Sequence, residues 1–424
     1  MNLKRKDFLK LSALAATAGA ISGISSCAVP ATSKADGKKL SNIAGDAKPI
    51  STAERDARIT KAQQLLTANK MAALILDCGT SLEYFTGVKW WPSERTMVAI
   101  IPAKGEVKYV CPGFEEDRLS ELITIGHEVF AWQEDESPYK LIANVLNEAG
   151  ITAGTIGIEE RLRYFIFSGI QKEAPHLNYV SGDPVTILCR IIKSATEIEL
   201  MLKASEITLT AIEHSVAQLK EGMTSAELAG LIMKAQGELG GNPDFALCLF
   251  GKDASFPHGT KSPSPLKKGD IVLMDCGCTV HGYNSDITRT VVFGTAPTAR
   301  QLDIWNLEKK AQDAGFAAAK IGSPLGDIDA AARKVITDAG FGPGYKVPGL
   351  PHRTGHGIGM DGHEWGNALK DNQLLIEPGM CFSIEPTIII PGEFGVRLED
   401  CVYMTQDGPK WFSKTSKSLQ EPFG

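Results

Sequence analysis

The sequence of 424 residues lacks a basic surplus, because its 44 lysines and arginines are outnumbered by 50 aspartates and glutamates. A nucleic-acid-binding protein normally carries excess positive charge, so no nucleic-acid partner is expected. The sequence also lacks a compositional bias. With 43% hydrophobic and 22% charged residues, it is not a wholly disordered chain, a collagen or a coiled coil. What is there suits a globular protein of two or three domains.

Cysteine is too scarce for a disulfide scaffold, since only nine are spread over the chain. We expect most of them to be small, buried apolar residues. Long apolar runs are missing as well. The run at residues 11–23 has 13 residues, whereas a helix needs about 20 to cross a bilayer.

That short run has the features of an export signal. The basic residues 4–6 precede it, as in a signal peptide. Residues 5–10 resemble a twin-arginine signal, although Lys6 replaces the second arginine, so the Sec and twin-arginine routes both stay open. A cytosolic protein with a basic N-terminus is the alternative.

Residues 24–27 (Ile-Ser-Ser-Cys) resemble a bacterial lipobox, which implies that Cys27 carries a lipid. We therefore assign residues 1–27 to an export signal with a lipobox. The expected protein is exported to the periplasm and touches a membrane only through its lipid anchor. Ala28 is not the aspartate associated with inner-membrane retention, which favours the inner leaflet of the outer membrane.

The rest of the chain divides into a tether and two domains of an α+β protein. Residues 28–50 are small and polar, which predicts a flexible tether. In residues 51–188, helical stretches alternate with short apolar runs, which predicts a smaller α/β domain. In residues 189–424, a pair of helices followed by strands occurs twice, as in a duplicated α+β unit.

Local signals place the main elements. Ser51, Ser194 and Thr224 each have a glutamate three positions later, which predicts three helix N-caps. Predicted helices cover residues 51–69, a long stretch from 195, and residues 225–238, 299–320 and 325–339. Predicted strands cover residues 71–76, 96–102, 106–111, 271–274, 287–293, 381–384 and 396–404.

Three blocks concentrate side chains that can bind metal ions. Asp275 ends an apolar strand and Asp286 starts the next, so a hairpin can bring the two carboxylates together. His356 lies among glycines, which permit close backbone approach. Glu385 and Glu399 stand in the third block, near the end of the chain.

Each of these residues alone has an ordinary explanation, as a turn, core or solvated strand residue. Together, four carboxylates around one histidine would repel one another without a cation. Carboxylates and an imidazole are mostly hard ligands, which favour Mn²⁺, Fe²⁺, Co²⁺ or Zn²⁺. Two such ions about 3.5–4 Å apart activate water and polarise a carbonyl group, which suits hydrolysis.

In order, type and spacing, the three blocks resemble the pita-bread metallopeptidases, the family of methionine aminopeptidase, aminopeptidase P and prolidase. The resemblance covers roughly residues 190–410. It implies a C-terminal pita-bread fold and a centre of two divalent ions, with Mn²⁺ as the first candidate. The implied ligands are Asp275, Asp286, His356, Glu385 and Glu399.

The resemblance also implies roles for residues around the metals. His258 and His363 resemble the substrate-side histidines, which hydrogen-bond the scissile amide or the oxyanion. Arg397 resembles the arginine near the metals of aminopeptidase P. His281 and His352 are expected to be structural or to support the ligands, rather than to bind metal themselves.

Residues 51–185 resemble, more weakly, the N-terminal domain of creatinase, prolidase and aminopeptidase P. Methionine aminopeptidases lack this domain, and creatinase does not keep the acidic set, so the proline-directed branch is favoured. That branch is often dimeric, which implies a homodimer. Trp90 and Trp91 could line the site of a neighbouring subunit, although ordinary packing is the expectation.

The expected activity is that of a Xaa-Pro aminopeptidase, on a peptide with proline at the second position. The expected proton shuttle is Glu385. A prolidase, which cleaves only dipeptides, is the first alternative. Residues 365–367 depart from the family pattern, so the resemblance does not define the wall of the substrate pocket or the exact leaving residue. A non-catalytic, envelope-anchored peptide-binding module on the same fold is the second, and phosphotriester cleavage would be a side activity.

Overall fold

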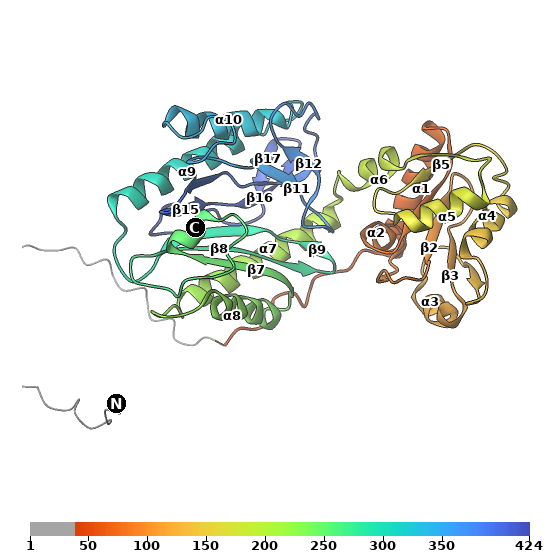
Figure 1. Cartoon of the computed structure of the whole chain (residues 1–424), viewed down its shortest axis with the longest axis horizontal. Helices are drawn as coiled ribbons and strands as arrows, with labels where there is room; N and C mark the ends of the chain where they lie inside the picture. The colour runs from red at the N-terminus through yellow and green to blue at the C-terminus, as the bar shows by residue number, and fades with distance from the viewer. Residues whose placement is uncertain (1–38) are drawn as a thin grey trace, which may run out of the picture. The chain divides into compact units, whose positions relative to one another are not determined.

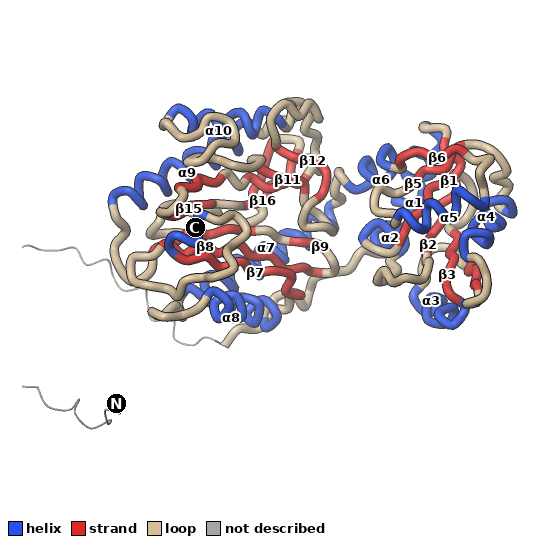
Figure 2. The backbone as a smooth tube through the Cα atoms, in the orientation of Figure 1, coloured by secondary structure: helices blue, strands red, loops and turns tan. Residues whose placement is uncertain are grey.

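The computed structural model describes residues 39–424 (Figures 1 and 2). The predicted export signal, the lipobox with Cys27 and residues 28–38 of the predicted tether lie outside the described residues. Within residues 39–424, none of the helices combines the length and hydropathy that a membrane span requires.

The N-terminal half of the described chain is built on a mixed six-stranded sheet of order β4-β3-β2-β1-β5-β6. Its strands are β1 (Met71–Asp77), β2 (Val98–Pro102), β3 (Lys108–Pro112), β4 (Glu128–Trp132), β5 (Thr155–Ile158) and β6 (Asn178–Ser181). Its helices are α1 (Thr52–Ala68), α2 (Thr80–Thr86), α3 (Glu116–Leu122), α4 (Pro138–Glu148), α5 (Tyr164–Glu173) and α6 (Asp183–Arg190), with the short 3₁₀ helix η1 (Gly113–Glu115).

Both faces of this sheet are buried. Along β1, Leu74 and Leu76 face a core shared with α1, α2, α3 and α6, whereas Ala73 and Ile75 face a core shared with α4 and α5. This alternation follows from the two-residue period of a strand. The predicted strands 96–102 and 106–111 are observed as β2 and β3, which form an antiparallel hairpin, and β1 pairs antiparallel with β2.

The C-terminal half consists of antiparallel sheets between helices. One sheet has the order β10-β8-β7, with β9 beside β8, a second has the order β12-β11-β13-β16-β17, and β14 pairs with β15. The strands are β7 (Asn242–Phe250), β8 (Ile271–Val280), β9 (Tyr283–Asn284), β10 (Ile287–Val292), β11 (Gly355–Gly357), β12 (Glu364–Ala368), β13 (Cys381–Ile384), β14 (Thr387–Ile390), β15 (Phe394–Arg397), β16 (Asp400–Thr405) and β17 (Gly408–Trp411).

The helices of this half are α7 (Ala195–Val216), α8 (Ser225–Glu238), α9 (Ala299–Ala318) and α10 (Gly326–Asp338), with the 3₁₀ helix η2 (Gly251–Ser255). Figure 1 shows α7 and α8 on one side of the strands and α9 and α10 on the other. Ser194 with Glu197 and Thr224 with Glu227 form the predicted capping boxes of α7 and α8.

Two expectations are corrected. The predicted strand 396–404 is two strands, β15 and β16, which belong to different sheets, and the break between them places Leu398 and Glu399. Residues 39–50 of the predicted tether have no helix or strand, but their apolar side chains pack against the C-terminal half. Ile50 is buried, Leu40 and Ile43 contact the core, and the N–H of Ile43 donates to the carbonyl of Leu239 at 2.9 Å.

The cysteines follow the expectation. All eight that the structure describes are free, and seven of them are buried.

Candidate metal centre

The five predicted ligands lie in or next to strands of the three sheets of the C-terminal half. Asp275 lies within β8, opposite Thr288 of β10, rather than at the end of a strand as expected. Asp286 immediately precedes β10, and His356 is the central residue of β11.

Glu385 and Glu399 each lie between two strands. Glu385 falls between β13 and β14, where its backbone N–H donates to the carbonyl of Thr354 at 2.7 Å. Glu399 falls between β15 and β16 and forms an isolated bridge with Thr288. A side chain at such a break is not bound to the alternation of a strand between the two faces of a sheet. It can therefore point toward the same site as the other ligands.

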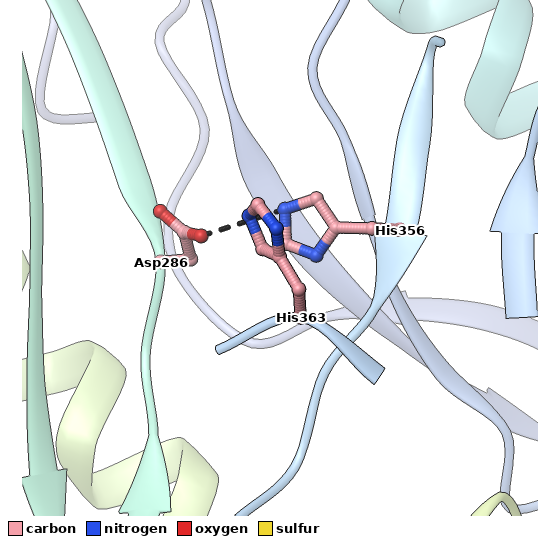
Figure 3. Close-up of side chains that lie close together, drawn as sticks. All are labelled: Asp286, His356 and His363. Atoms are coloured by element: carbon pink, nitrogen blue, oxygen red, sulfur yellow. Dashed lines mark ion pairs between the residues drawn. The ribbon is translucent and has the colours of Figure 1, made fainter. Parts of the chain in front are cut away.

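The five side chains converge. Nε2 of His356 lies 3.2 Å from Oε1 of Glu385 and 3.8 Å from Oε1 of Glu399. It lies 3.6 Å from Oδ2 of Asp286, the pair drawn in Figure 3. Within the described residues, three groups of ligand atoms lie within 4.8 Å of one another: those of His356, Glu385 and Glu399, those of Asp275, Asp286 and Glu399, and those of Asp286, His356 and His363. The first two groups contain all five predicted ligands and share Glu399, which suits two ions.

The five side chains suit divalent cations because several of their ligand atoms make no hydrogen bond to any described residue. One oxygen each of Asp275, Asp286 and Glu399 is buried and has no hydrogen-bond partner within residues 39–424. Buried carboxylate oxygens are normally satisfied, so these three are open to a ligand. The Nδ1 atom of His356 faces the carbonyl of Gly357 at 3.1 Å, which leaves the lone pair of Nε2 for a metal ion.

The pKa values also indicate a cation site. Burial, with the charges of Asp275 and Glu385, raises the pKa of Asp286 well above its ordinary value. Burial raises the pKa of Glu385 to about 7, against the opposing charge of Arg397. Burial lowers the pKa of His356 to about 3, so its imidazole is neutral, as a metal ligand must be. Cations would stabilise the charged carboxylates.

Neighbouring side chains orient the ligands. Oγ1 of Thr288 donates to Oε2 of Glu399 at 2.8 Å, and Oγ of Ser383 donates to Oε1 of Glu385 at 3.3 Å. The buried guanidinium of Arg397 is ion-paired with Asp275, and its Nε donates to Oγ1 of Thr288 at 3.1 Å. Arg397 therefore lies beside the ligands, as expected.

The glycines around His356 allow close approach, as predicted. A Cβ on Gly355 would overlap the carbonyl oxygen of Ser383, and one on Gly357 would overlap that of Trp365. The strand that carries His356 is therefore pressed between its two neighbours, β12 and β13.

The other histidines of the prediction are the two expected on the substrate side, His258 and His363, and the two expected to be structural, His281 and His352. The ring of His363 lies 3.9 Å from that of His356, so it is at the centre (Figure 3). Burial, together with the charge of Arg353, lowers the pKa of His363. His258 is exposed and, within the described range, has no hydrogen-bond partner. His352 contacts Thr387 at 3.0 Å, and His281 contacts the carbonyl of Ala47 at 3.2 Å, which agrees with structural roles.

Comparisons with known proteins decide the family. The model of metallopeptidase family M24 matches residues 199–406, and that of the creatinase/prolidase N-terminal domain matches residues 58–192. The putative dipeptidase YkvY of Bacillus subtilis is 31% identical over 366 residues, which is 85% of this chain and 99% of that protein. The chain belongs to metallopeptidase family M24.

Two solved structures are similar to this M24 peptidase over nearly their whole length. The dipeptidase from Pyrococcus horikoshii OT3 is 31% identical with a TM-score of 0.78, covering 85% of this chain and 99% of that chain. The prolidase from Thermococcus sibiricus is 30% identical with a TM-score of 0.78, covering 85% and 97%. The predicted pita-bread fold with a creatinase-like N-terminal domain is confirmed.

M24 peptidases use divalent metal ions, and the donor set of this one suits them. Sequence reasoning missed two residues at the centre, Thr288 and Arg353. Thr288 lies two positions after Asp286, and Arg353 lies three before His356, so both stood inside the metal-binding blocks.

Proposed function

We propose that this M24 peptidase is a prolidase, a metal-dependent dipeptidase that hydrolyses the peptide bond of Xaa-Pro dipeptides. The similar proteins described above bear the names dipeptidase and prolidase, which supports this alternative over the Xaa-Pro aminopeptidase that we expected first. The observation that carries the proposal is the convergence of all five ligand side chains, with three buried carboxylate oxygens left open.

Asp275, Asp286, His356, Glu385 and Glu399 would hold two divalent ions, with Mn²⁺ as the first candidate. Such ions supply Lewis-acid chemistry that activates water and polarises a carbonyl group. The bond before proline is a tertiary amide without an N–H, so recognition falls to groups around the carbonyl and the proline ring.

Glu385 is the proposed proton shuttle. It accepts a proton from the attacking water and passes it to the leaving nitrogen of proline, and Ser383 holds one of its oxygens at 3.3 Å. His363 would donate to the developing oxyanion, for which its ring is placed beside His356. Such a donor typically contributes about 3–4 kcal/mol to transition-state stabilisation. His258 would serve the substrate from the exposed side of the site.

Cleavage of matched peptides tests the proposal. Ala-Pro and Ala-Pro-Gly-Gly would be incubated with protein lacking residues 1–27, with and without added Mn²⁺, and the products measured. Cleavage of the dipeptide alone supports a prolidase, whereas cleavage of the tetrapeptide supports a Xaa-Pro aminopeptidase. No cleavage, together with no stoichiometric metal in the purified protein, would support the non-catalytic peptide-binding module. His363→Ala should lower kcat while metal content stays unchanged.

The proposal includes export, a lipid on Cys27 and a homodimer. The first two rest on residues 4–27 of the sequence alone. Incorporation of a labelled fatty acid, with Cys27→Ser as the control, tests the anchor, and membrane fractionation tests the preference for the outer membrane. Light scattering of the purified protein tests the dimer.

A further inference from the structure

Arg353 places a positive charge next to the site histidines. Its side chain is half-buried, and Nη2 donates to Nδ1 of His363 at 3.3 Å. The ring of His363 in turn lies 3.9 Å from that of His356. One side chain therefore separates the guanidinium of Arg353 from the predicted metal ligands.

This guanidinium lacks a counterion. Within residues 39–424, no carboxylate lies within ion-pair distance of Arg353, and its side chain bonds only to the ring of His363. The neighbouring arginines are neutralised, since Arg397 pairs with Asp275 and Arg333 pairs with Asp329. A partly desolvated charge is costly without a partner, so an anionic group of a ligand would be bound favourably here.

The backbone on both sides of Arg353 is held in place. The N–H and Oγ1 of Thr354 both donate to Oδ1 of Asp329, at 3.1 and 2.8 Å. The guanidinium of Arg333 donates to the carbonyl of His352 at 2.7 Å. The charge therefore projects from a fixed base, and a ligand need not order that base on binding.

The chemistry of a dipeptide puts an anion at this place. Standard bond lengths put the carboxylate carbon of the C-terminal residue about 2.5 Å from the scissile nitrogen. If His363 contacts the scissile amide, the carboxylate of the substrate lies next to His363. Arg353 also lies next to His363, so its guanidinium is within reach of that carboxylate.

We propose that Arg353 binds the free carboxylate of the dipeptide substrate and thereby determines the specificity for dipeptides. The inference rests on the proposed prolidase function. A longer peptide presents a neutral amide in place of the carboxylate, so the guanidinium would stay unpaired and the peptide would bind less tightly. Because arginine stays charged at any working pH, this selection does not depend on protonation of Arg353.

The test combines two substrates with altered proteins. Ala-Pro carries the carboxylate, and Ala-Pro-amide is its neutral counterpart. Arg353→Met removes the charge while keeping the length of the side chain, and Arg353→Lys keeps the charge but loses the planar fork. Arg300→Met is the matched control, because Arg300 is an exposed arginine whose ion pair is with Glu393. The Mn²⁺-loaded proteins would be compared by kcat/KM.

The unaltered protein should favour Ala-Pro over its amide. Arg353→Met should lower kcat/KM for Ala-Pro about 100-fold, mainly through KM. Its effect on Ala-Pro-amide should stay within about threefold, and Arg353→Lys should recover part of the loss. An equal loss on both substrates would overturn the inference and make Arg353 a positioning residue for His363. An unchanged preference would overturn it as well.

A binding measurement separates this inference from the proposed function. Absence of cleavage by the unaltered protein would count against the prolidase. In that case, calorimetric titration with L-proline and L-prolinamide decides the inference. Tighter binding of proline that disappears in Arg353→Met supports a carboxylate site, whereas equal binding before and after the substitution refutes it.

Discussion

Thr288 and Glu399 are joined by three hydrogen bonds. Their backbones exchange two N–H···O bonds of 3.2 Å, and Oγ1 of Thr288 donates to Oε2 of Glu399 at 2.8 Å. The other oxygen, Oε1, is buried 3.8 Å from Nε2 of His356 and has no hydrogen-bond partner in the described part of the chain. A threonine thus determines which oxygen of Glu399 is free for a metal ion.

Thr288→Val should weaken metal binding. Valine keeps the shape of threonine but removes the hydroxyl, so Glu399 can rotate away from the centre. We expect the affinity for Mn²⁺, measured by calorimetric titration, to fall about 10–100-fold. Thr60→Val is the control, because the hydroxyl of Thr60 bonds only to its own helix on the exposed face of α1. Equal affinity of both variants would mean that the backbone bonds alone orient Glu399.

Metal ions should stabilise the folded protein. Added Mn²⁺ at 100 times its Kd should increase the free energy of unfolding by about 2.7 kcal/mol, seen as a higher Tm in scanning calorimetry. Asp286→Asn should abolish this increase. In the metal-free protein the same substitution should raise Tm, because burial and the charges of Asp275 and Glu385 raise the pKa of Asp286 and thereby make this carboxyl group destabilising at neutral pH. A lower Tm of the metal-free variant would argue against repulsion at the centre.

Gly357, the last residue of β11, and Gly362, in the loop that follows it, should differ in their tolerance of a side chain. A Cβ on Gly357 would overlap the carbonyl oxygen of Trp365, whereas Gly362 has no atom within 4 Å of such a Cβ. Gly357→Ala should displace β11 together with His356, and purified protein should then contain less metal. Gly362→Ala should keep its metal. Metal analysis beside a circular dichroism spectrum measures both, and full metal content in Gly357→Ala would contradict the close packing.

Local signals explain what could be predicted. Helix α8 begins directly after its N-cap, Thr224. Thr224 and Glu227 are three positions apart and form a capping box, so the sequence alone specifies where this helix begins. The five ligands could be predicted by residue type and order, because a cage of carboxylates needs a cation wherever the chain places it. The structure brings all five together.

Long-range contacts explain what could not be predicted. The apolar pattern of residues 396–404 looks like one strand, but Thr288 binds Glu399 from another sheet and the strand breaks there. Leu40 and Ile43 lie in a polar stretch with no periodicity, and the surface that they contact is formed by distant helices. The contact between Arg353 and His363 depends likewise on the fold of a glycine-rich loop.

Glu364 follows His363 directly and is almost fully buried with two cations. Its Oε1 lies 2.5 Å from Nη2 of Arg190, and its Oε2 lies 2.8 Å from Nζ of Lys193. Burial alone would raise the pKa of Glu364, but Lys193 and Arg190 outweigh it and lower the pKa to about 2. This ion cluster fixes the chain next to His363.

Glu364→Gln should therefore be strongly destabilising at neutral pH and less so in acid. Lys193 would lose its anion and Arg190 would keep only Asp361, at 2.8 Å, which should cost about 3–5 kcal/mol. Because the folded pKa is depressed, the contribution of Glu364 is present above its ordinary pKa and is lost as the pH falls toward 2. The difference in unfolding free energy between parent and variant, measured by urea denaturation, should shrink over that range. Glu134→Gln, which breaks the exposed pair with Arg95, should change little at any pH. A difference that stays constant in acid would mean that shape, rather than charge, holds Glu364.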